Sequence, residues 1–180
     1  MIPVRLTTER LVLDQPVAAD RELIAEFCRD PLFEKYMTLP WPYELKHADY
    51  FIDKVAPGGW DTDSEYTWAI RHDGQFLGAI GYRSTGKDFG YWLGAPHRGK
   101  GYMTEAARAM LDWLFERGEQ VVLWECVVGN TASAAIAQRL GFAYTGTGPT
   151  QLVFRDGSHP MAWHGELRRG VDRTTEWPTA

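Results

Sequence analysis

The stretch Ala95-Pro-His-Arg-Gly-Lys-Gly-Tyr-Met-Thr-Glu105 decides the fold, because it predicts a basic glycine turn that leads directly into a helix. The aromatic run at 89–93 just before it is typical of a strand. The first turn of a helix has backbone N–H groups without an intrahelical acceptor, and the helix dipole adds positive charge there. Strand, turn and helix start together therefore predict a cradle for a pyrophosphate.

The residues of the turn suit that ligand. Gly99 and Gly101 let the backbone come close to a phosphate, since neither carries a Cβ atom. Arg98 and Lys100 add positive charge beside them. We therefore expect both the backbone and the cationic side chains of the turn to contact phosphate groups.

Two common phosphate-binding patterns are excluded. A dinucleotide-binding turn has a third glycine, in G-x-G-x-x-G, but Gly99-x-Gly101 is followed by Tyr102, Met103 and Thr104. The ATP-binding pattern G-x-x-x-x-G-K-[ST] occurs nowhere in the chain. The turn is therefore expected to bind a phosphate-bearing ligand of another kind.

Composition indicates a small soluble protein. The 180 residues favour one domain, expected over 1–170, with a polar and frayed tail at 171–180. A net charge of −5 argues against nucleic acid as a partner. No apolar run is long enough for a membrane span, and the first residues do not resemble a signal peptide. Cys28 and Cys126 lie far apart and are expected to be free thiols, which favours the cytoplasm.

The first half of the chain is predicted to alternate short strands and helices. A helix at 20–29 is expected to end at Asp30-Pro31, and a Gly58-Gly59-Trp60 turn is expected after a short helical patch. A turn at 72–75 is expected to join a hairpin. The predicted strands lie at 10–14, 66–70, 76–82 and 89–93.

The second half predicts a strand–helix–strand unit. Apolar residues from Met103 to Leu114 recur at helical spacing, Gly118 ends that helix, and 121–128 is an apolar strand. One crossover between two strands implies a right-handed unit with a parallel pair. A helix at 131–140 and closing strands at 142–145 and 161–167 follow.

Three motifs resemble those of one superfamily. Arg98-x-x-Gly101 is similar to the start of motif A of the GNAT acyltransferases, which binds the coenzyme A pyrophosphate, although Met103 stands where that motif has Gly or Ala. Asn130-x-x-Ser133 with Leu140-Gly-Phe142 resembles their motif B. Thr8-Glu-Arg-Leu11, together with the run at 99–106, resembles the RimJ/RimL-like branch.

The resemblance implies a fold of the α+β type. It is a mixed, mostly antiparallel twisted sheet of six to seven strands with a splayed central parallel pair, flanked by about four helices. It also implies an N-acetyltransferase with acetyl-CoA as donor and no metal. Members of this branch acetylate the α-amino groups of protein N-termini or small amines.

The resemblance further implies which residues contact coenzyme A. They belong to the strand end, the glycine turn and motif B, and they are Trp92, Leu93, Arg98, Gly99, Lys100, Gly101, Tyr102, Met103, Thr104, Asn130 and Ser133. Asn130 is expected near the pantetheine amides, but its position also suits an N-cap of the following helix.

The catalytic groups are less clearly marked. Relatives often use a glutamate and a tyrosine at positions that are Trp124 and Ile136 here. Ser133 is our candidate for the proton donor to the departing thiolate, with Asn130 beside it; a simple helix cap is the alternative for Ser133. Cys126 shares a strand face with Trp124 and is either an acyl-accepting thiol or a small buried filler.

The missing carboxylate favours a weakly basic acceptor. Deprotonating an α-amine at neutral pH costs about 1 kcal/mol, whereas a lysine side chain costs about 4 to 5 kcal/mol. We therefore expect an α-amine or a similar acceptor. A carboxylate that reaches in from Glu44, Glu65 or Asp156 would weaken this argument.

The segment 37–60 is rich in large side chains. Met37, Trp41, Tyr43 and Trp60 are our candidates for the wall of an acceptor pocket, together with the connection at 146–160. Packing over the core and a homodimer contact are equally open alternatives.

Two other functions stay open at this stage. One is an acyl-CoA-binding module that turns nothing over. The other is a transferase for a larger donor such as succinyl-CoA, which needs a basic residue near the acyl end. Arg71, Arg83 and Arg155 are the candidates for that residue.

Overall fold

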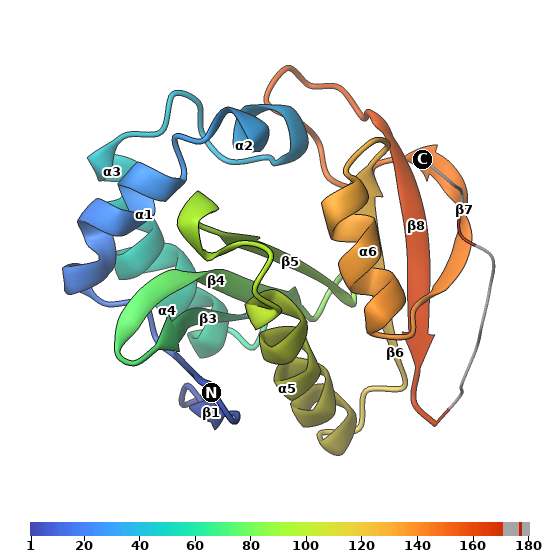
Figure 1. Cartoon of the computed structure of the whole chain (residues 1–180), viewed down its shortest axis with the longest axis horizontal. Helices are drawn as coiled ribbons and strands as arrows, with labels where there is room; N and C mark the ends of the chain where they lie inside the picture. The colour runs from blue at the N-terminus through green and yellow to red at the C-terminus, as the bar shows by residue number, and fades with distance from the viewer. Residues whose placement is uncertain (171–176, 178–180) are drawn as a thin grey trace.

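The computed structural model describes residues 1–170 and 177 and contains one sheet of eight strands in the order β1-β2-β3-β4-β5-β6-β8-β7 (Figure 1). The expected tail at 171–180 lies, except for Trp177, outside the described residues. The strands are β1 (Leu6–Thr7), β2 (Leu11–Asp14), β3 (Glu65–His72), β4 (Gln75–Arg83), β5 (Asp88–Leu93), β6 (Val121–Val127), β7 (Ala143–Pro149) and β8 (Met161–Arg168).

Helices flank the sheet. The α-helices are α1 (Arg21–Phe27), α2 (Pro31–Tyr36), α3 (Leu45–Tyr50), α4 (Ala56–Asp61), α5 (Tyr102–Glu116) and α6 (Thr131–Arg139). The shorter turns are η1 (Ala18–Asp20), the π-helical η2 (Phe51–Val55) and η3 (Ala95–His97). None of the helices between residues 1 and 170 is long and apolar enough to cross a membrane.

The central parallel pair is splayed, as expected. Strands β5 and β6 pair only at Asp88 and Leu123, while every other neighbouring pair is antiparallel. Beyond that contact the two strands diverge, which leaves an opening in the middle of the sheet. The mixed α+β fold is confirmed, with eight strands where six to seven were expected, and the additional strand is the two-residue β1.

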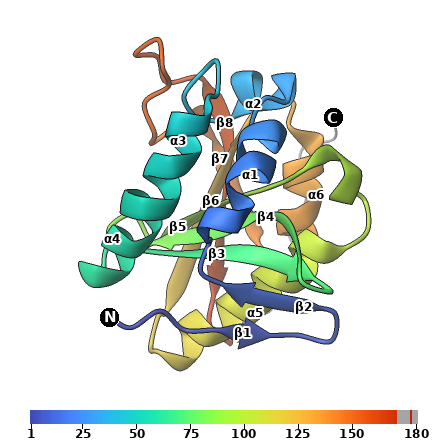
Figure 2. The ribbon, with the colours of Figure 1, turned by 90° about the vertical axis from the view of Figure 1, so that its left-hand side faces the viewer.

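Helices lie on both faces of the sheet (Figure 2), and each face carries an apolar core of buried side chains. One joins the sheet to α5 and α6 and contains Met110, Trp124 and Phe142. The other joins it to α1, α2 and α3 and contains Ile24 and Phe33. The opening between β5 and β6 therefore leads from one helical layer to the other.

One predicted turn is wrong, and one correctly predicted helix end is followed directly by a helix that was not predicted. Asp30-Pro31 ends α1 but also starts α2, because the Asp30 carboxylate accepts the Leu32 N–H at 2.9 Å and proline is tolerated at the first helical position. The Gly58-Gly59-Trp60 turn lies within α4. Gly59 serves close packing there, since a Cβ atom would stand 2.4 Å from the Glu65 carbonyl oxygen.

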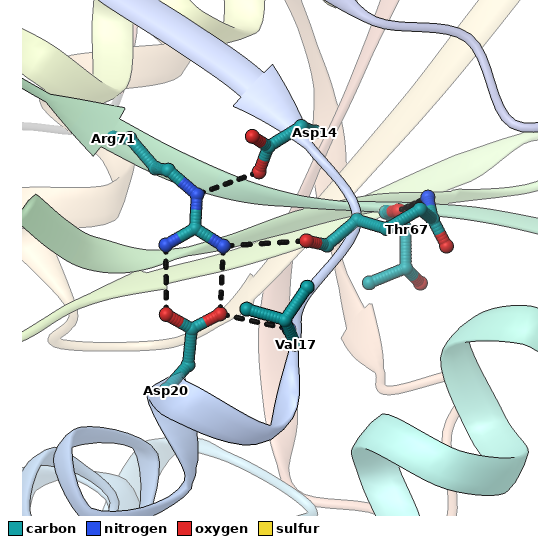
Figure 3. A network of polar contacts seen from close by, with 6 residues as sticks. Asp14, Val17, Asp20, Thr67 and Arg71 are labelled. Carbon is teal, nitrogen blue, oxygen red and sulfur yellow. Dashed lines mark hydrogen bonds and ion pairs between the residues drawn. The ribbon is translucent and has the colours of Figure 1, made fainter. Parts of the chain in front are cut away.

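A buried ion-pair network fixes the start of α1 against the sheet (Figure 3). Arg71 of β3 donates to both carboxylate oxygens of Asp20 at 2.7 Å and to Asp14 of β2 at 2.7 Å. Asp20 also accepts the Val17 N–H at 2.8 Å. These hydrogen bonds, above all those that Arg71 donates to Asp20, hold the pKa of Arg71 above its usual value.

Candidate active site

A cavity of about 1450 Å³ passes through the opening between β5 and β6. The α5 side supplies the glycine turn except Lys100 and the first turn of that helix, and the α6 side supplies residues 129–133, 135–136 and 139. The opposite face supplies α2, residues 37–39 and parts of β3 and β4. A ligand in this cavity can therefore contact both faces of the sheet.

The glycine turn has the geometry expected of a phosphate cradle. Gly99 and Gly101 adopt φ values of 74° and 80°, a left-handed conformation that favours glycine, and Gly101 is the N-cap of α5. Nothing lies within 4 Å of where a Cβ of Gly99 would stand. Of the residues expected to contact coenzyme A, all line the cavity except Lys100.

Arg98 connects the elements that line the cavity at the N-terminal end of α5. Its Nη1 lies 2.7 Å from an Asp30 carboxylate oxygen, and its Nε donates to the Leu93 carbonyl at 2.9 Å. The guanidinium also stands 5.2 Å from the centre of the Phe33 ring. Its Nη2 is buried without a hydrogen-bond partner. Arg98 thus joins the end of β5 to α2 and keeps one donor for a ligand.

Three further arginines line this end, and none of them was among the residues expected to contact coenzyme A. Arg10 forms an ion pair with Glu105 at 2.6 Å and donates to the Lys100 carbonyl at 3.2 Å. Arg108 donates to the Arg139 carbonyl at 3.3 Å, and both residues line the cavity. Only the folded chain brings the β1–β2 turn, α5 and α6 together here. The result is a basic mouth beside the N-terminus of α5.

A cluster of three polar side chains occupies the centre of the cavity. The Ser133 hydroxyl lies 2.8 Å from the Tyr91 hydroxyl, and the Trp124 indole N–H donates to the Tyr91 oxygen at 3.3 Å. Burial raises the pKa of Tyr91, so this phenol stays protonated. Because Trp124 can only donate, the Tyr91 oxygen accepts from it, and the Tyr91 hydroxyl can donate to the Ser133 hydroxyl or to the Ser133 backbone carbonyl, which lies 3.2 Å away. The sequence placed Tyr91 in a predicted strand and gave no signal of its contact with Ser133.

Asn130 has the capping role that was open for it. Its side-chain oxygen accepts the Ser133 N–H at 3.2 Å, which makes it the N-cap of α6. Because the cap uses the backbone of Ser133, the Ser133 hydroxyl is left for the cavity. Asn130 itself also lines the cavity.

Cys126 lies beside this cluster but is poorly suited to accept an acyl group. Its thiol is buried and lies 3.6 Å from the Asn130 carbonyl oxygen. Burial raises the pKa of Cys126 to about 12, so the nucleophilic thiolate is scarce at neutral pH. The geometry favours the alternative of a small buried filler.

The four candidates for the acceptor pocket are not brought together. Met37 lines the cavity, whereas Trp41 does not. Tyr43 is 4% exposed in the core beneath α1 and α3, and Trp60 is fully buried against Trp68 in the other core. Large aromatic side chains from one connecting segment have been divided between the two cores. For Tyr43 and Trp60 the expected pocket role is therefore wrong.

The connection between β7 and β8 forms part of the cavity wall on the face opposite α5. Arg155, in the connection between β7 and β8, donates to the carbonyls of Met37 at 2.8 Å and Leu39 at 2.6 Å, and to that of Glu34. Phe154 and Leu152 of the same connection line the cavity. Arg155 thus ties two walls of the cavity together from segments far apart in the sequence.

Replacing Arg155 with alanine should loosen that wall. Arg155 is exposed, so we expect each lost bond to matter little for folding, and a total of about 1 kcal/mol to be lost from acceptor binding. This corresponds to an increase of about fivefold in KM for the acceptor. Steady-state kinetics with the acceptor varied would test it. An unchanged acceptor KM, or a change confined to the donor KM, would contradict the role.

The basic residues proposed for a larger acyl donor are all engaged. Arg71 is bound by Asp14 and Asp20 and does not line the cavity, and Arg155 binds backbone carbonyls. Arg83 lines the cavity but forms an ion pair with Asp88. None of the three is free to bind the second carboxylate of a succinyl group.

Comparison with known proteins agrees with this geometry. The family model "Acetyltransferase (GNAT) domain" matches residues 10–143. YdaF of Bacillus subtilis, described provisionally as a ribosomal N-acetyltransferase, is 29% identical over 106 residues, which cover 56% of this chain and 58% of YdaF. The matched regions of the curated relatives thus span about half to two thirds of their length.

Two solved structures share the fold. RimL, a ribosomal L7/L12 α-N-protein acetyltransferase in complex with coenzyme A, has a TM-score of 0.79 at 15% identity and covers 92% of this chain and 98% of its own. The microcin C7 self-immunity acetyltransferase MccE, in complex with acetyl-CoA and AMP, has a TM-score of 0.77 at 21% identity and covers 89% and 93%. With its family model matching most of its length, the chain belongs to the GNAT acetyltransferase family.

Proposed function

We propose that this chain transfers the acetyl group of acetyl-CoA to a primary amine, which is the α-amino group of a protein or peptide N-terminus or of a small molecule. The observation that carries the proposal is the continuous cavity through the splayed strands. It has a basic cradle at the α5 end and the Ser133 hydroxyl at its centre.

The donor fits the α5 end. The N-terminus of α5, the turn at Gly99 and Gly101 and the unpartnered Nη2 of Arg98 would hold the pyrophosphate. Arg10 and Arg108 stand close enough to the mouth to contact a further phosphate. The pantetheine arm would then enter between β5 and β6, where backbone groups of Trp92 and Leu93 are no longer paired with β6.

The chemistry is attack of a neutral amine on the thioester carbonyl. The nitrogen forms a bond to the acyl carbon, the carbon–sulfur bond breaks, and the leaving thiolate takes a proton. Ser133 is our candidate for that proton donor, since its hydroxyl is oriented by Tyr91 and faces the cavity.

The relatives support a protein acceptor. RimL is an α-N-protein acetyltransferase, and YdaF carries a ribosomal assignment. An acceptor of this size needs an open cavity, and the walls formed by α2, residues 37–39 and the β7–β8 connection leave the cavity reachable from outside. We therefore place peptide N-termini ahead of small amines.

An acceptor screen tests the proposal. Release of free coenzyme A from acetyl-CoA should be measured with N-terminal peptides, free amino acids and amine antibiotics. We expect thiol release with at least one class of α-amine. Binding of acetyl-CoA without thiol release in any arm would identify a binding module instead, and faster release from succinyl-CoA would identify the larger donor.

A further inference from the structure

The floor of the cavity on the α1–α3 face is crossed by a bare strip of sheet. Thr67 of β3, Gly81 of β4 and Gly90 of β5 are successive partners across the three strands, and all three line the cavity. Gly90 is exposed although its neighbours Asp88 and Trp92 on the same face are buried. Nothing lies within 4 Å of the place where its Cβ would stand. This strip is open down to the backbone.

The next row across the same strands carries charge. Glu65, Arg83 and Asp88 are cross-strand partners there, and all three line the cavity. Arg83 donates to Asp88 through two nitrogens and forms an ion pair with it. The row holds two carboxylates and one guanidinium, so it carries one excess negative charge, and the Glu65 carboxylate accepts the Thr67 hydroxyl at 3.4 Å.

The Glu65 side chain leans over the bare strip toward β5. A Cβ on Gly81 would stand 3.3 Å from Glu65 Oε1 and 3.2 Å from the Thr67 hydroxyl oxygen. The carboxylate therefore already lies above β4, and only the open space over Gly90 separates it from β5. Strand β5 is the edge along which the sheet opens, with Tyr91 and its contact to Ser133 one residue further on.

We propose that Glu65 binds the ammonium group of the acceptor in the strip over Gly81 and Gly90 and takes one proton from it. This inference rests on the proposed acetyltransferase function and names the acceptor as a cation. One proton passes from the ammonium to the Glu65 carboxylate, directly or through one water, and the freed lone pair of nitrogen forms the bond to the acyl carbon. The carbon–sulfur bond breaks, and sulfur takes its proton from Ser133. The second nitrogen proton passes through water to the Ser133 oxygen and restores the hydroxyl, while protonated Glu65 releases its proton to solvent, which is the one proton that the net reaction yields.

The surroundings suit such a base. Burial raises the pKa of the Glu65 carboxyl, although Arg83 and Thr67 oppose the shift and Asp88 adds to it. Gly59 of α4 packs closely against the Glu65 backbone and brings no charge. A raised pKa makes Glu65 a better proton acceptor than an exposed carboxylate. We expected an α-amine because the sequence lacked the usual catalytic carboxylate. With Glu65 as a base, more basic amines are acceptors as well.

Glu65→Gln is the first test, because glutamine keeps the shape and can still accept from Thr67. With acetyl-CoA saturating and a free-amine peptide varied, kcat/KM should fall about 100-fold while KM for acetyl-CoA stays unchanged. In the wild type kcat/KM should fall as pH drops through the raised pKa of Glu65, because the protonated carboxyl cannot accept a proton. This fall of kcat/KM at low pH should be absent from the Glu65→Gln variant. Glu26→Gln, an exposed glutamate of α1, is the matched control.

Gly90→Ala is a second variant that does not touch the carboxylate. Its methyl group would fill the open space without a steric clash, so folding should be preserved while kcat/KM for the peptide falls about tenfold. An equilibrium measurement completes the test. In the presence of coenzyme A, the wild type should bind a free-amine peptide more tightly than its N-acetylated form, and Glu65→Gln should remove that difference.

The outcomes separate the two proposals. If the wild type transfers acetyl groups but Glu65→Gln keeps the kcat/KM and pH profile of the wild type, the role of Glu65 is overturned and the transferase stands. If no amine is acetylated, the proposed function fails, and the binding measurement still decides about Glu65. Equal affinity of the wild type for free and N-acetylated peptides overturns the ammonium site.

Discussion

Replacing Ser133 with alanine is expected to lower kcat for acetyl transfer by about 100-fold and to leave KM for acetyl-CoA within about twofold. The hydroxyl faces the cavity, and Tyr91 orients it from 2.8 Å. A departing thiolate without a proton donor must wait for water, which slows the step in which the carbon–sulfur bond breaks. Donor binding uses the glycine turn instead and should be unaffected.

The variant also separates the two roles that were open for Ser133. The cap of α6 uses the Ser133 backbone N–H and the Asn130 side chain, so alanine at this position keeps it. A merely structural residue would therefore show normal kcat and a lowered melting temperature. Thr85→Ala removes an exposed hydroxyl in the β4–β5 turn and is the control. An unchanged kcat in Ser133→Ala would reject the proton-donor role.

Tyr91→Phe distinguishes a lone hydroxyl from a cluster. It removes the group that accepts from Trp124 and donates to Ser133. If the cluster acts as a unit, Tyr91→Phe should lower kcat as well, and the double variant should be little worse than Ser133→Ala alone. Additive losses would show that the two hydroxyls act independently.

The donor half of the site was predictable because its signal is local. Arg98, Gly99 and Gly101 are neighbours in sequence, and the turn they form precedes a strongly amphipathic helix. The parallel pairing of β5 and β6 follows from the same segment, since one crossover helix joins the two strands, whereas their splaying was implied by the family resemblance. Local turn chemistry and hydrophobic spacing carry this kind of information.

Local signals did not reveal the start of α2, and they predicted a turn where α4 lies. Asp30-Pro31 stops α1 and caps α2, and Gly59 lies in a helix because Glu65 packs against it. A stop signal and a start signal look alike when no loop separates two helices. A glycine required by tertiary contact looks like a glycine required by a turn.

The acceptor half could not be predicted because it depends on register. Glu65 and Asp88 are far apart in sequence. They lie in one cross-strand row because each is the register partner of Arg83. Tyr91 reaches Ser133 only because β5 and β6 diverge at that level. A shift of one residue in either pairing would turn these side chains to the other face.

Replacing Asp20 with alanine is expected to lower the free energy of unfolding by about 3 to 5 kcal/mol. Asp20 is 3% exposed, and its two oxygens bind the Arg71 guanidinium at 2.7 Å. Without it, a largely buried cation keeps only Asp14 and the Gln15 carbonyl as partners. The Val17 N–H loses its acceptor as well, so the turn that starts α1 is weakened.

Urea denaturation of Asp20→Ala beside Glu22→Ala measures this effect. Glu22 is also an acidic residue at the start of α1, but its side chain is 75% exposed, so its ion pair with Arg21 should contribute less than about 1 kcal/mol. A double variant, Asp20→Leu with Arg71→Leu, should recover much of the lost stability, because the cost lies in the unpaired charge rather than in the missing pair. If the double variant is as unstable as Asp20→Ala, the network stabilises the protein by holding η1 and β3 together, and desolvation of Arg71 is not the cause.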